Sequence, residues 1–286
     1  MEHFYIIANP KRDQGLKLTK ELYQFILEHG KHCGYQANQE PEGIIFDKDQ
    51  IPQETECILV VGGDGTLLRA ARNMADRNIP LMGINTGHVG YLCELEEKNA
   101  IQGVSRLLTE DDYTVERRML LSGCCVCEQG AKEERIALND IVIHRSRALQ
   151  VVDLVISVNG QYLNTYSADG IIIATPTGST AYSMSAGGPI VDPNVELLVV
   201  TPICPHTLNA KSIVLGAGDE ITIEVETRST SQEEQVTVSF DGEYVGVLTA
   251  GEQIKVKKAQ GYTRILKLSR LSFLERLRKK LQGSSW

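Results

Sequence analysis

Long apolar runs are missing from this sequence, and none of its hydrophobic stretches approaches the roughly 20 residues that a membrane-spanning helix needs. The first seven residues form a strand-like pattern and lack the basic start and cleavage site of a signal peptide. We therefore expect a cytoplasmic protein without a membrane partner.

Positive charge is also scarce, since 29 Lys and Arg stand against 37 Asp and Glu, for a net charge of −8. This balance argues against nucleic acid or an anionic membrane as the main partner. A hydrophobic content of 42% and a charged content of 23% are ordinary for a globular protein, and 286 residues are enough for two domains.

Cysteines are few and unevenly placed. Their number, seven, is odd, and their scatter favours free thiols over a disulfide framework. Cys124, Cys125 and Cys127 are close enough to raise the possibility of a metal site, but no second pair follows at zinc-site spacing and no His lies close behind. We favour a structural role in a strand, because a free cysteine behaves as a small hydrophobic side chain.

The stretch 58–69, ILVVGGDGTLLR, is the most informative part of the chain. Four apolar residues predict a buried strand, the glycines predict a tight turn, and a helical pattern follows from Thr66. Glycines at the end of such a strand let backbone N–H groups approach a phosphate, and the helix dipole favours negative charge. A Walker lysine is absent, so this is not an ordinary P-loop.

Asp64 is the unexpected residue of this turn, because a carboxylate repels phosphate unless it has a task. Two tasks fit: holding a cation that bridges to phosphate, or accepting a proton from an attacking hydroxyl. A third interpretation makes Asp64 a simple helix N-cap.

The first part of the chain alternates strands and helices, which predicts a parallel α/β sheet. Ligands of such sheets bind beyond the carboxyl ends of the strands, so the Asp64 turn and the loop of residues 85–91 should share one crevice. We predict strands at 4–8, 44–46, 58–61 and 81–85 and helices at 17–29, 66–75 and 99–108.

Beyond Tyr113 the pattern becomes mostly β, with turn signals such as Asn159-Gly160 between strand-like runs. We predict strands at 119–126, 134–143, 151–158, 161–166, 170–174, 197–201, 212–215, 220–227, 235–240, 244–248 and 252–258, and a polar turn at 229–234.

The segment 272–282 predicts a helix with Phe273, Leu274, Leu277 and Leu281 on one face and basic residues around them. A membrane-surface helix is one interpretation, and we favour docking on the first domain. The predicted fold is α/β plus mostly-β: a Rossmann-like parallel-sheet domain at 1–115, a β-sandwich-like domain at 116–268, and a helix at 269–286 that returns to the first domain.

Three further groups of residues suit recognition of a nucleotide. Asn139 and Asp140 interrupt an apolar run, and an amide beside a carboxylate suits a ribose and an adenine edge, although a bulge or turn also explains them. Asp169 precedes a strand and then the loop 175–189, which is rich in hydroxyls and glycines and carries Tyr182, an aromatic able to cover a base. A flexible loop fits poorly there because two prolines stiffen it. Asp241, followed by glycine, predicts first of all a hairpin turn.

The segment 62–66, the Asn139-Asp140 pair, the loop 175–189 and the segment 201–208 occur in the same order as in the NAD kinase family, which this chain resembles over nearly its whole length. The glycine-aspartate motif alone also resembles the loop of diacylglycerol and sphingosine lipid kinases and of 6-phosphofructokinases. The combination is specific to NAD kinases.

The resemblance implies an NAD kinase, which transfers the γ-phosphate of ATP, or in some members of polyphosphate, to the 2′-hydroxyl of the adenosine ribose of NAD, with a divalent metal, Mg²⁺. It implies a homodimer or homotetramer, and it assigns no metal ligand. Asp64 matches the base that accepts the hydroxyl proton. The residues that match substrate-binding positions are Gly65, Arg69, Tyr91, Asn139, Asp140, Asp169, Thr180, Ala181, Tyr182 and Ser185.

Two departures from the family pattern concern the substrate. Some relatives have Glu in place of Asp140, and many bacterial relatives have a basic residue just before the acid that matches Asp169, where this chain has Ala168. The choice between NAD and NADH therefore stays open, as do two rival classes of function: a lipid kinase, for which the loop 175–185 is too polar, and a non-enzymatic NAD sensor, which gains nothing from Asp64.

Overall fold

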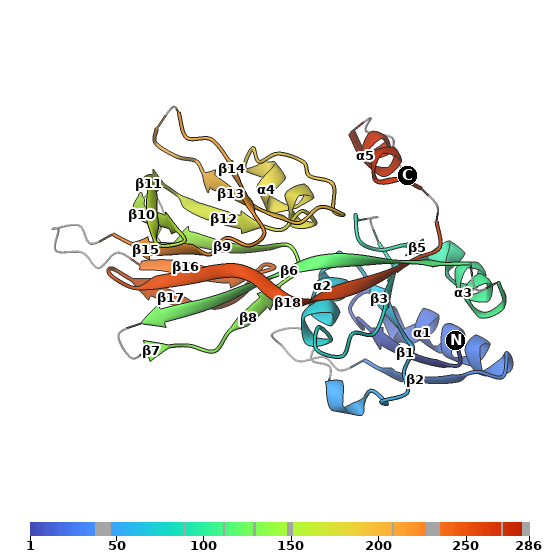
Figure 1. Cartoon of the computed structure of the whole chain (residues 1–286). Helices are drawn as coiled ribbons and strands as arrows, with labels where there is room; N and C mark the ends of the chain where they lie inside the picture. The colour runs from blue at the N-terminus through green and yellow to red at the C-terminus, as the bar shows by residue number, and fades with distance from the viewer. Residues whose placement is uncertain are drawn as a thin grey trace. The chain divides into compact units, whose positions relative to one another are not determined.

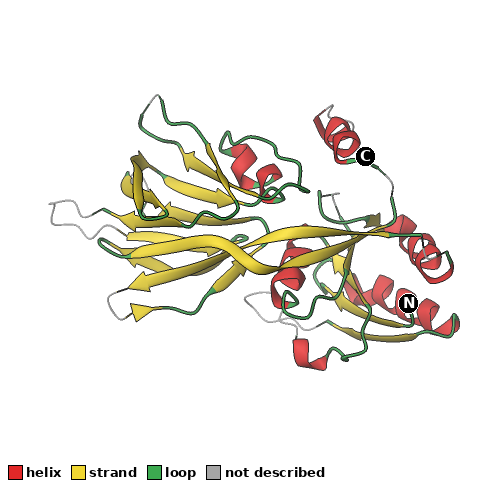
Figure 2. Cartoon of the chain, viewed as in Figure 1, coloured by secondary structure: helices red, strands yellow, loops and turns green. Residues whose placement is uncertain are grey.

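The chain divides into two compact units, and the computed structural model describes each of them (Figure 1). Unit 1 comprises Met1–Arg117 and Thr263–Trp286, and unit 2 comprises Arg118–Tyr262. Helices dominate unit 1 and strands dominate unit 2 (Figure 2). The described residues are 1–37, 47–87, 90–110, 112–127, 130–147, 151–207, 209–226, 235–269 and 271–281.

Unit 1 is built on a parallel sheet in the order β5-β4-β3-β1-β2, and Ile265 of β18 pairs in parallel with Leu81 of β4. The prediction of a parallel α/β sheet is confirmed. The elements are β1 (His3–Ala8), α1 (Lys17–Glu28), β2 (His32–Gln36), β3 (Cys57–Gly62), α2 (Asp64–Asn73), β4 (Leu81–Asn85), β5 (Leu95–Glu96), α3 (Ala100–Thr109) and α5 (Phe273–Leu281).

Alternation along the strands of unit 1 gives the sheet two apolar faces. One face packs on α1 and α3, whose buried residues include Leu22 and Val104. The other face carries Gly83, where an added Cβ would lie 3.2 Å from Leu67 of α2 and 2.9 Å from Cys93. The helix that begins at Asp64 and the segment around Cys93 therefore lie on the same face of the sheet.

Unit 2 is a sandwich of two sheets around a core of buried aliphatic side chains, as the alternating pattern predicts. One sheet pairs β11-β10-β15-β18 antiparallel, and the other follows the order β14-β13-β12-β9-β16-β17. The elements are β6 (Thr114–Cys127), β7 (Gly130–Ala131), β8 (Arg135–Ala137), β9 (Asp140–Arg145), β10 (Val152–Val158), β11 (Gln161–Ala168), β12 (Gly170–Ala174), α4 (Tyr182–Ser185), β13 (Leu197–Ile203), β14 (Ile213–Gly216), β15 (Ile221–Val225), β16 (Gln235–Phe240), β17 (Glu243–Thr249) and β18 (Gln253–Lys267). The chain leaves unit 1 inside β6 and returns inside β18.

The second strand of unit 1, β2, lies in a stretch where the sequence pattern predicts no strand. Gly34 lies inside β2, and a Cβ added to it would lie 2.9 Å from the ring of Tyr5. The glycine therefore leaves room for this ring of the neighbouring strand. The strand predicted at 44–46 and the polar turn at 229–234 lie outside the described residues. The strand predicted at 134–143 is divided by a bend at Leu138 and Asn139 into β8 and β9.

The C-terminal helix α5 belongs to unit 1 and makes charged contacts there. Arg276 lies 3.7 Å from Glu94 and 3.9 Å from Glu116, Phe273 and Leu277 are half-buried, and Leu274 is 70% exposed. Docking through the apolar face of the helix stays a prediction. None of the helices in the described ranges is long and apolar enough to cross a membrane. All seven cysteines are free thiols.

Candidate active site

The glycine-rich turn after β3 directs Asp64 into the first turn of α2. Gly63 is the N-cap residue and makes no side-chain cap bond, so the interpretation of Asp64 as the N-cap is wrong. Asn9 fixes the turn from β1, because its Nδ2 donates to Oγ1 of Thr66 at 3.2 Å. Gly62 has no room for a side chain, since an added Cβ would lie 2.4 Å from that same Oγ1.

The carboxylate of Asp64 is held by three consecutive backbone amides. Tyr91 N–H donates to Oδ2 at 2.7 Å and Cys93 N–H donates to Oδ1 at 3.2 Å. Leu92 N–H lies between them, 3.3 Å from each oxygen. Three consecutive backbone donors therefore fix the orientation of this carboxylate.

Gly90 leaves room for the Asp64 carboxylate, because a Cβ at that position would lie 1.8 Å from Oδ2. These contacts bring Gly90 and Tyr91 to the Asp64 turn, and the crevice that the sequence predicts at these two loops stays a prediction. Burial raises the pKa of the neighbouring Cys93 thiol above its ordinary value, and the Asp64 carboxylate raises it further. Cys93 is therefore a neutral neighbour of the carboxylate and not a nucleophile.

Two more predicted residues lie on the same helix. Gly65 is exposed and has no heavy atom within 4 Å of the position of an added Cβ, which leaves open space beside Asp64. Arg69 is half-buried, and five residues along a helix place it about 140° around the axis from Asp64. The helix thus does not bring Arg69 and Asp64 to one face.

In unit 2, the Asn139-Asp140 pair lies at the bend between β8 and β9, next to the start of the loop 175–189. Thr175 binds this bend twice: its N–H donates to the carbonyl of Asn139 at 2.9 Å and its Oγ1 donates to the carbonyl of Leu138 at 2.6 Å. Gly178 allows the close packing, since an added Cβ would lie 2.0 Å from the Asn139 carbonyl oxygen. The interpretation as a turn is confirmed, and the turn is fixed by the loop.

Asp140 is a buried acid with an acid beside it. Its side chain is 5% exposed, and burial, followed by the charge of Asp241, raises its pKa to about 7. Asp241 occupies the hairpin turn between β16 and β17 with a φ of 49°, as the Asp-Gly signal predicts. Its carboxylate also accepts N–H bonds of 2.9, 2.7 and 3.2 Å from Leu138, Asn139 and Asp140. One aspartate therefore shapes the bend and disfavours ionisation of the other.

The loop 175–189 is a fixed structure and not a flexible one. Ser179 donates to the carbonyl of Pro176 at 2.7 Å and accepts from the N–H of Val191 at 3.0 Å. Ser183 is buried and lies 3.0 Å from the hydroxyl of Thr201. The residues predicted to bind substrate lie on its less buried side: Thr180 and Ala181 are half-buried, and Tyr182 and Ser185 are exposed.

Asp169 forms an ion pair with Arg145 of β9, whose Nη2 lies 3.1 Å from the carboxylate. Arg145 thus provides a cation next to this acid, although the residue before Asp169 is not basic. Burial raises the pKa of Tyr182, and the charges of Cys204, Asp169 and Asp140 raise it further.

Sequence reasoning misses the donors that hold Asp64, since backbone N–H groups carry no residue signature. It also misses Arg145, which lies 24 positions before Asp169 and is brought there by the antiparallel pairing of β9 with β12. For Asp241 the turn was found, but its second role as an acceptor for three amides was not, because that role depends on a bend about 100 residues away.

A fixed carboxylate in a glycine-rich turn at the end of a parallel strand, together with a sandwich unit that carries a polar loop and a buried acid, defines the class as a nucleotide-binding enzyme of two units. The family models agree with that class. A model described as ATP-NAD kinase N-terminal domain matches residues 46–113, and one described as ATP-NAD kinase C-terminal domain matches residues 138–268.

Relatives extend this match to the whole chain. A protein named NAD kinase from Agathobacter rectalis is 47% identical over 287 residues and covers 100% of both chains. Another protein of that name, from Lachnospira eligens, is 42% identical and covers 98% of this chain and 100% of its own. The chain belongs to the NAD kinase family and is an enzyme of that family.

Solved structures support the fold. The yeast NADH kinase complexed with NADH has a TM-score of 0.85 at 23% identity and covers 100% of this chain and 89% of its own. An NAD kinase from Archaeoglobus fulgidus in complex with ATP has a TM-score of 0.76 at 24% identity, with 99% of this chain and 100% of its own covered.

Proposed function

We propose that this enzyme transfers the γ-phosphate of ATP to the 2′-hydroxyl of the adenosine ribose of NAD, giving NADP and ADP, with Asp64 as the general base. The observation that carries the proposal is the carboxylate of Asp64, which three amides hold in one orientation in a glycine-rich turn.

The reaction balances with a single acid–base group. The 2′-hydroxyl gives its proton to Asp64, its oxygen forms a bond to the γ-phosphorus, and the bond from that phosphorus to the β,γ-bridging oxygen breaks as ADP leaves. Phosphoryl transfer asks mainly for positioning and charge compensation, and a fixed base supplies the first of these. The open space beside Gly65 at the start of α2 suits a phosphate near the helix N-terminus.

Unit 2 supplies the groups that suit the dinucleotide. Asn139 and Asp140 suit the adenine and ribose, Asp169 the nicotinamide half, and Tyr182 the face of a ring. Thr180, Ala181 and Ser185 belong to the same loop as Tyr182 and are also proposed to bind NAD. In unit 1, Arg69 is proposed to bind the nucleotide and Tyr91 to stack on adenine.

A divalent metal, Mg²⁺, is proposed to arrive with ATP. Mg²⁺ prefers substrate phosphates, waters and one or two carboxylates over a closed protein cage. When bound, the metal neutralises charge on the phosphates.

Two other functions fit less well. A lipid kinase needs an apolar substrate pocket, whereas the loop 175–185 offers hydroxyls and a buried acid lies beside it. A non-enzymatic NAD sensor has no use for a carboxylate held in one orientation. The proposed setting is the cytoplasm, where free thiols are stable.

The test is NADP formation by the purified protein with NAD, ATP and Mg²⁺, alongside a reaction in which polyphosphate replaces ATP. NADP in the ATP reaction is the expected result, and the second reaction measures the donor range. Absence of NADP from both reactions, with NAD binding still measurable by calorimetry, would favour the sensor.

A further inference from the structure

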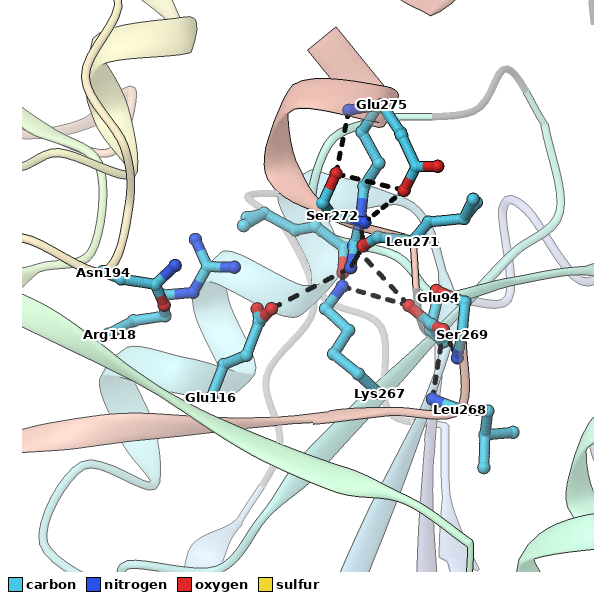
Figure 3. Close-up of polar contacts among 12 residues, drawn as sticks. Glu94, Glu116, Arg118, Asn194, Lys267, Leu268, Ser269, Leu271, Ser272 and Glu275 are labelled. Carbon is cyan, nitrogen blue, oxygen red and sulfur yellow. Dashed lines mark hydrogen bonds and ion pairs between the residues drawn. The ribbon is translucent and has the colours of Figure 1, made fainter.

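A buried lysine lies directly behind the loop that holds Asp64. Lys267, at the end of β18, is 1% exposed. Its Nζ donates to the carbonyl of Leu92 at 3.1 Å and lies 3.3 Å from Oε2 of Glu94, whose side chain is 3% exposed. Figure 3 shows the side chains of Lys267 and Glu94 directed toward one another. A charge pair so fully buried is costly to desolvate and is weak evidence for stability, so it calls for another explanation.

The contact reaches Asp64 through a single peptide group. The carbonyl of Leu92 and the N–H of Cys93 belong to one planar trans peptide, so they point in opposite directions. Lys267 binds the carbonyl end, and Asp64 accepts from the N–H end at 3.2 Å. A cation on the carbonyl fixes the plane and polarises the N–H toward the carboxylate.

Glu94 connects Lys267 with the residues that follow it and with Arg276 of α5. Oε1 of Glu94 accepts the N–H groups of Leu268 and Ser269 at 3.1 and 2.6 Å (Figure 3). Oε2 of Glu94 lies 3.7 Å from Nη1 of Arg276 on α5. The C-terminal segment is thereby connected to the Asp64 loop by charged contacts.

We propose that Lys267 is a positioning residue of the phosphoryl transfer: through the Leu92–Cys93 peptide it orients the amides that fix Asp64, with Glu94 and Arg276 holding it from the other side. The inference rests on the proposed function, because it needs Asp64 to act in the reaction. In this proposal Lys267 acts through the peptide and not by contact with the substrate.

The first experiment is a double-mutant cycle of Lys267→Met and Asp64→Asn, with kcat and both KM values measured on folded protein. Lys267→Met should lower kcat about tenfold or more while the KM values for ATP and NAD change less than about threefold. In the Asp64→Asn background the same change should lower kcat by less than about twofold, because its effect passes through Asp64.

The outcomes separate the two proposals. Normal turnover of Asp64→Asn would remove the proposed base, whatever Lys267 does. A large loss for Asp64→Asn combined with no loss for Lys267→Met, or with the same loss in both backgrounds, would overturn the role of Lys267 alone.

A second pair of variants covers the case in which Lys267→Met does not fold. Arg276→Gln removes the outer contact of the network, and Arg278→Gln changes an exposed residue of the same helix. Hydrogen exchange of the 91–93 amides should be about threefold faster or more in Arg276→Gln, with kcat lowered, and both should match the unmodified protein in Arg278→Gln. Equal exchange and equal kcat in the two variants would contradict the proposal.

Discussion

The two aspartates at the centre of this account differ in what surrounds them. Asp64 receives three backbone N–H bonds, whereas Asp140 is buried next to the like charge of Asp241. The donors fix the orientation of the first carboxylate, and burial beside another carboxylate favours the neutral form of the second. The same residue type is thereby given two different tasks by backbone geometry.

Asp140 should make stability depend on pH. Its pKa rises from an ordinary 3.8 to about 7 on folding, so the unfolded chain loses this proton first. Stability is therefore full below about pH 4 and falls as the pH rises through about 7. Relative to Asp140→Asn, the unfolding free energy should drop by about 3 kcal/mol from about pH 5 to about pH 8.

Urea denaturation of both proteins across that range measures the difference. Parallel curves for the two proteins would show that Asp140 ionises as readily in the fold as in the unfolded chain.

Gly90→Ala should disable the base without unfolding the protein. A Cβ there would lie 1.8 Å from Oδ2 of Asp64, so the carboxylate must leave its amides. A displacement of about 1 Å at a reacting group costs about 100-fold in rate, and we expect a loss of kcat of that order. The matched control is Gly218→Ala, where no atom lies within 4 Å of the added group. Equal turnover of the two variants would argue against a role in catalysis for the three amides that hold Asp64.

At the scale of elements, the bend between β8 and β9 depends on the hairpin of β16 and β17. Asp241 accepts three amides of the bend, so Asp241→Ala should lower the unfolding free energy by about 2–4 kcal/mol. Asp241→Asn keeps an acceptor oxygen and should cost less. Thermal and urea unfolding of the two variants measure this, and a loss below about 0.5 kcal/mol for Asp241→Ala would mean that water replaces the aspartate.

How far the sequence predicts these elements depends on where their partners lie. β4 (Leu81–Asn85) and β16 (Gln235–Phe240) match their predicted bounds, because an apolar run or an alternating pattern carries the signal locally. β2 carries no such signal, since Gly34 has low strand propensity and its close approach to the ring of Tyr5 is a tertiary contact.

In the candidate site, too, local signals are visible in the sequence and distant partners are not. Asp64 is conspicuous in the sequence because an acid in a phosphate turn is unusual, whereas its amide partners and Lys267 are about 30 and 200 positions away and carry no local signal.

At the scale of the whole molecule, the resemblance implies a homodimer or homotetramer. Unit 2 exposes Tyr162 and Tyr244 on strands β11 and β17, at 66% and 62%. Sedimentation velocity should therefore give a dimer or a tetramer, and a monomer at micromolar concentration would contradict the expectation.

The central claim, that this enzyme of the NAD kinase family uses Asp64 as its general base, is tested most directly by Asp64→Asn. The amide keeps the size of the side chain and cannot accept the hydroxyl proton, so kcat for NADP formation should fall by about 100-fold or more. NAD affinity by calorimetry should stay within about threefold of the unmodified protein. Turnover within about threefold of normal would contradict the account, and loss of NAD binding together with turnover would make Asp64 a binding residue and not the base.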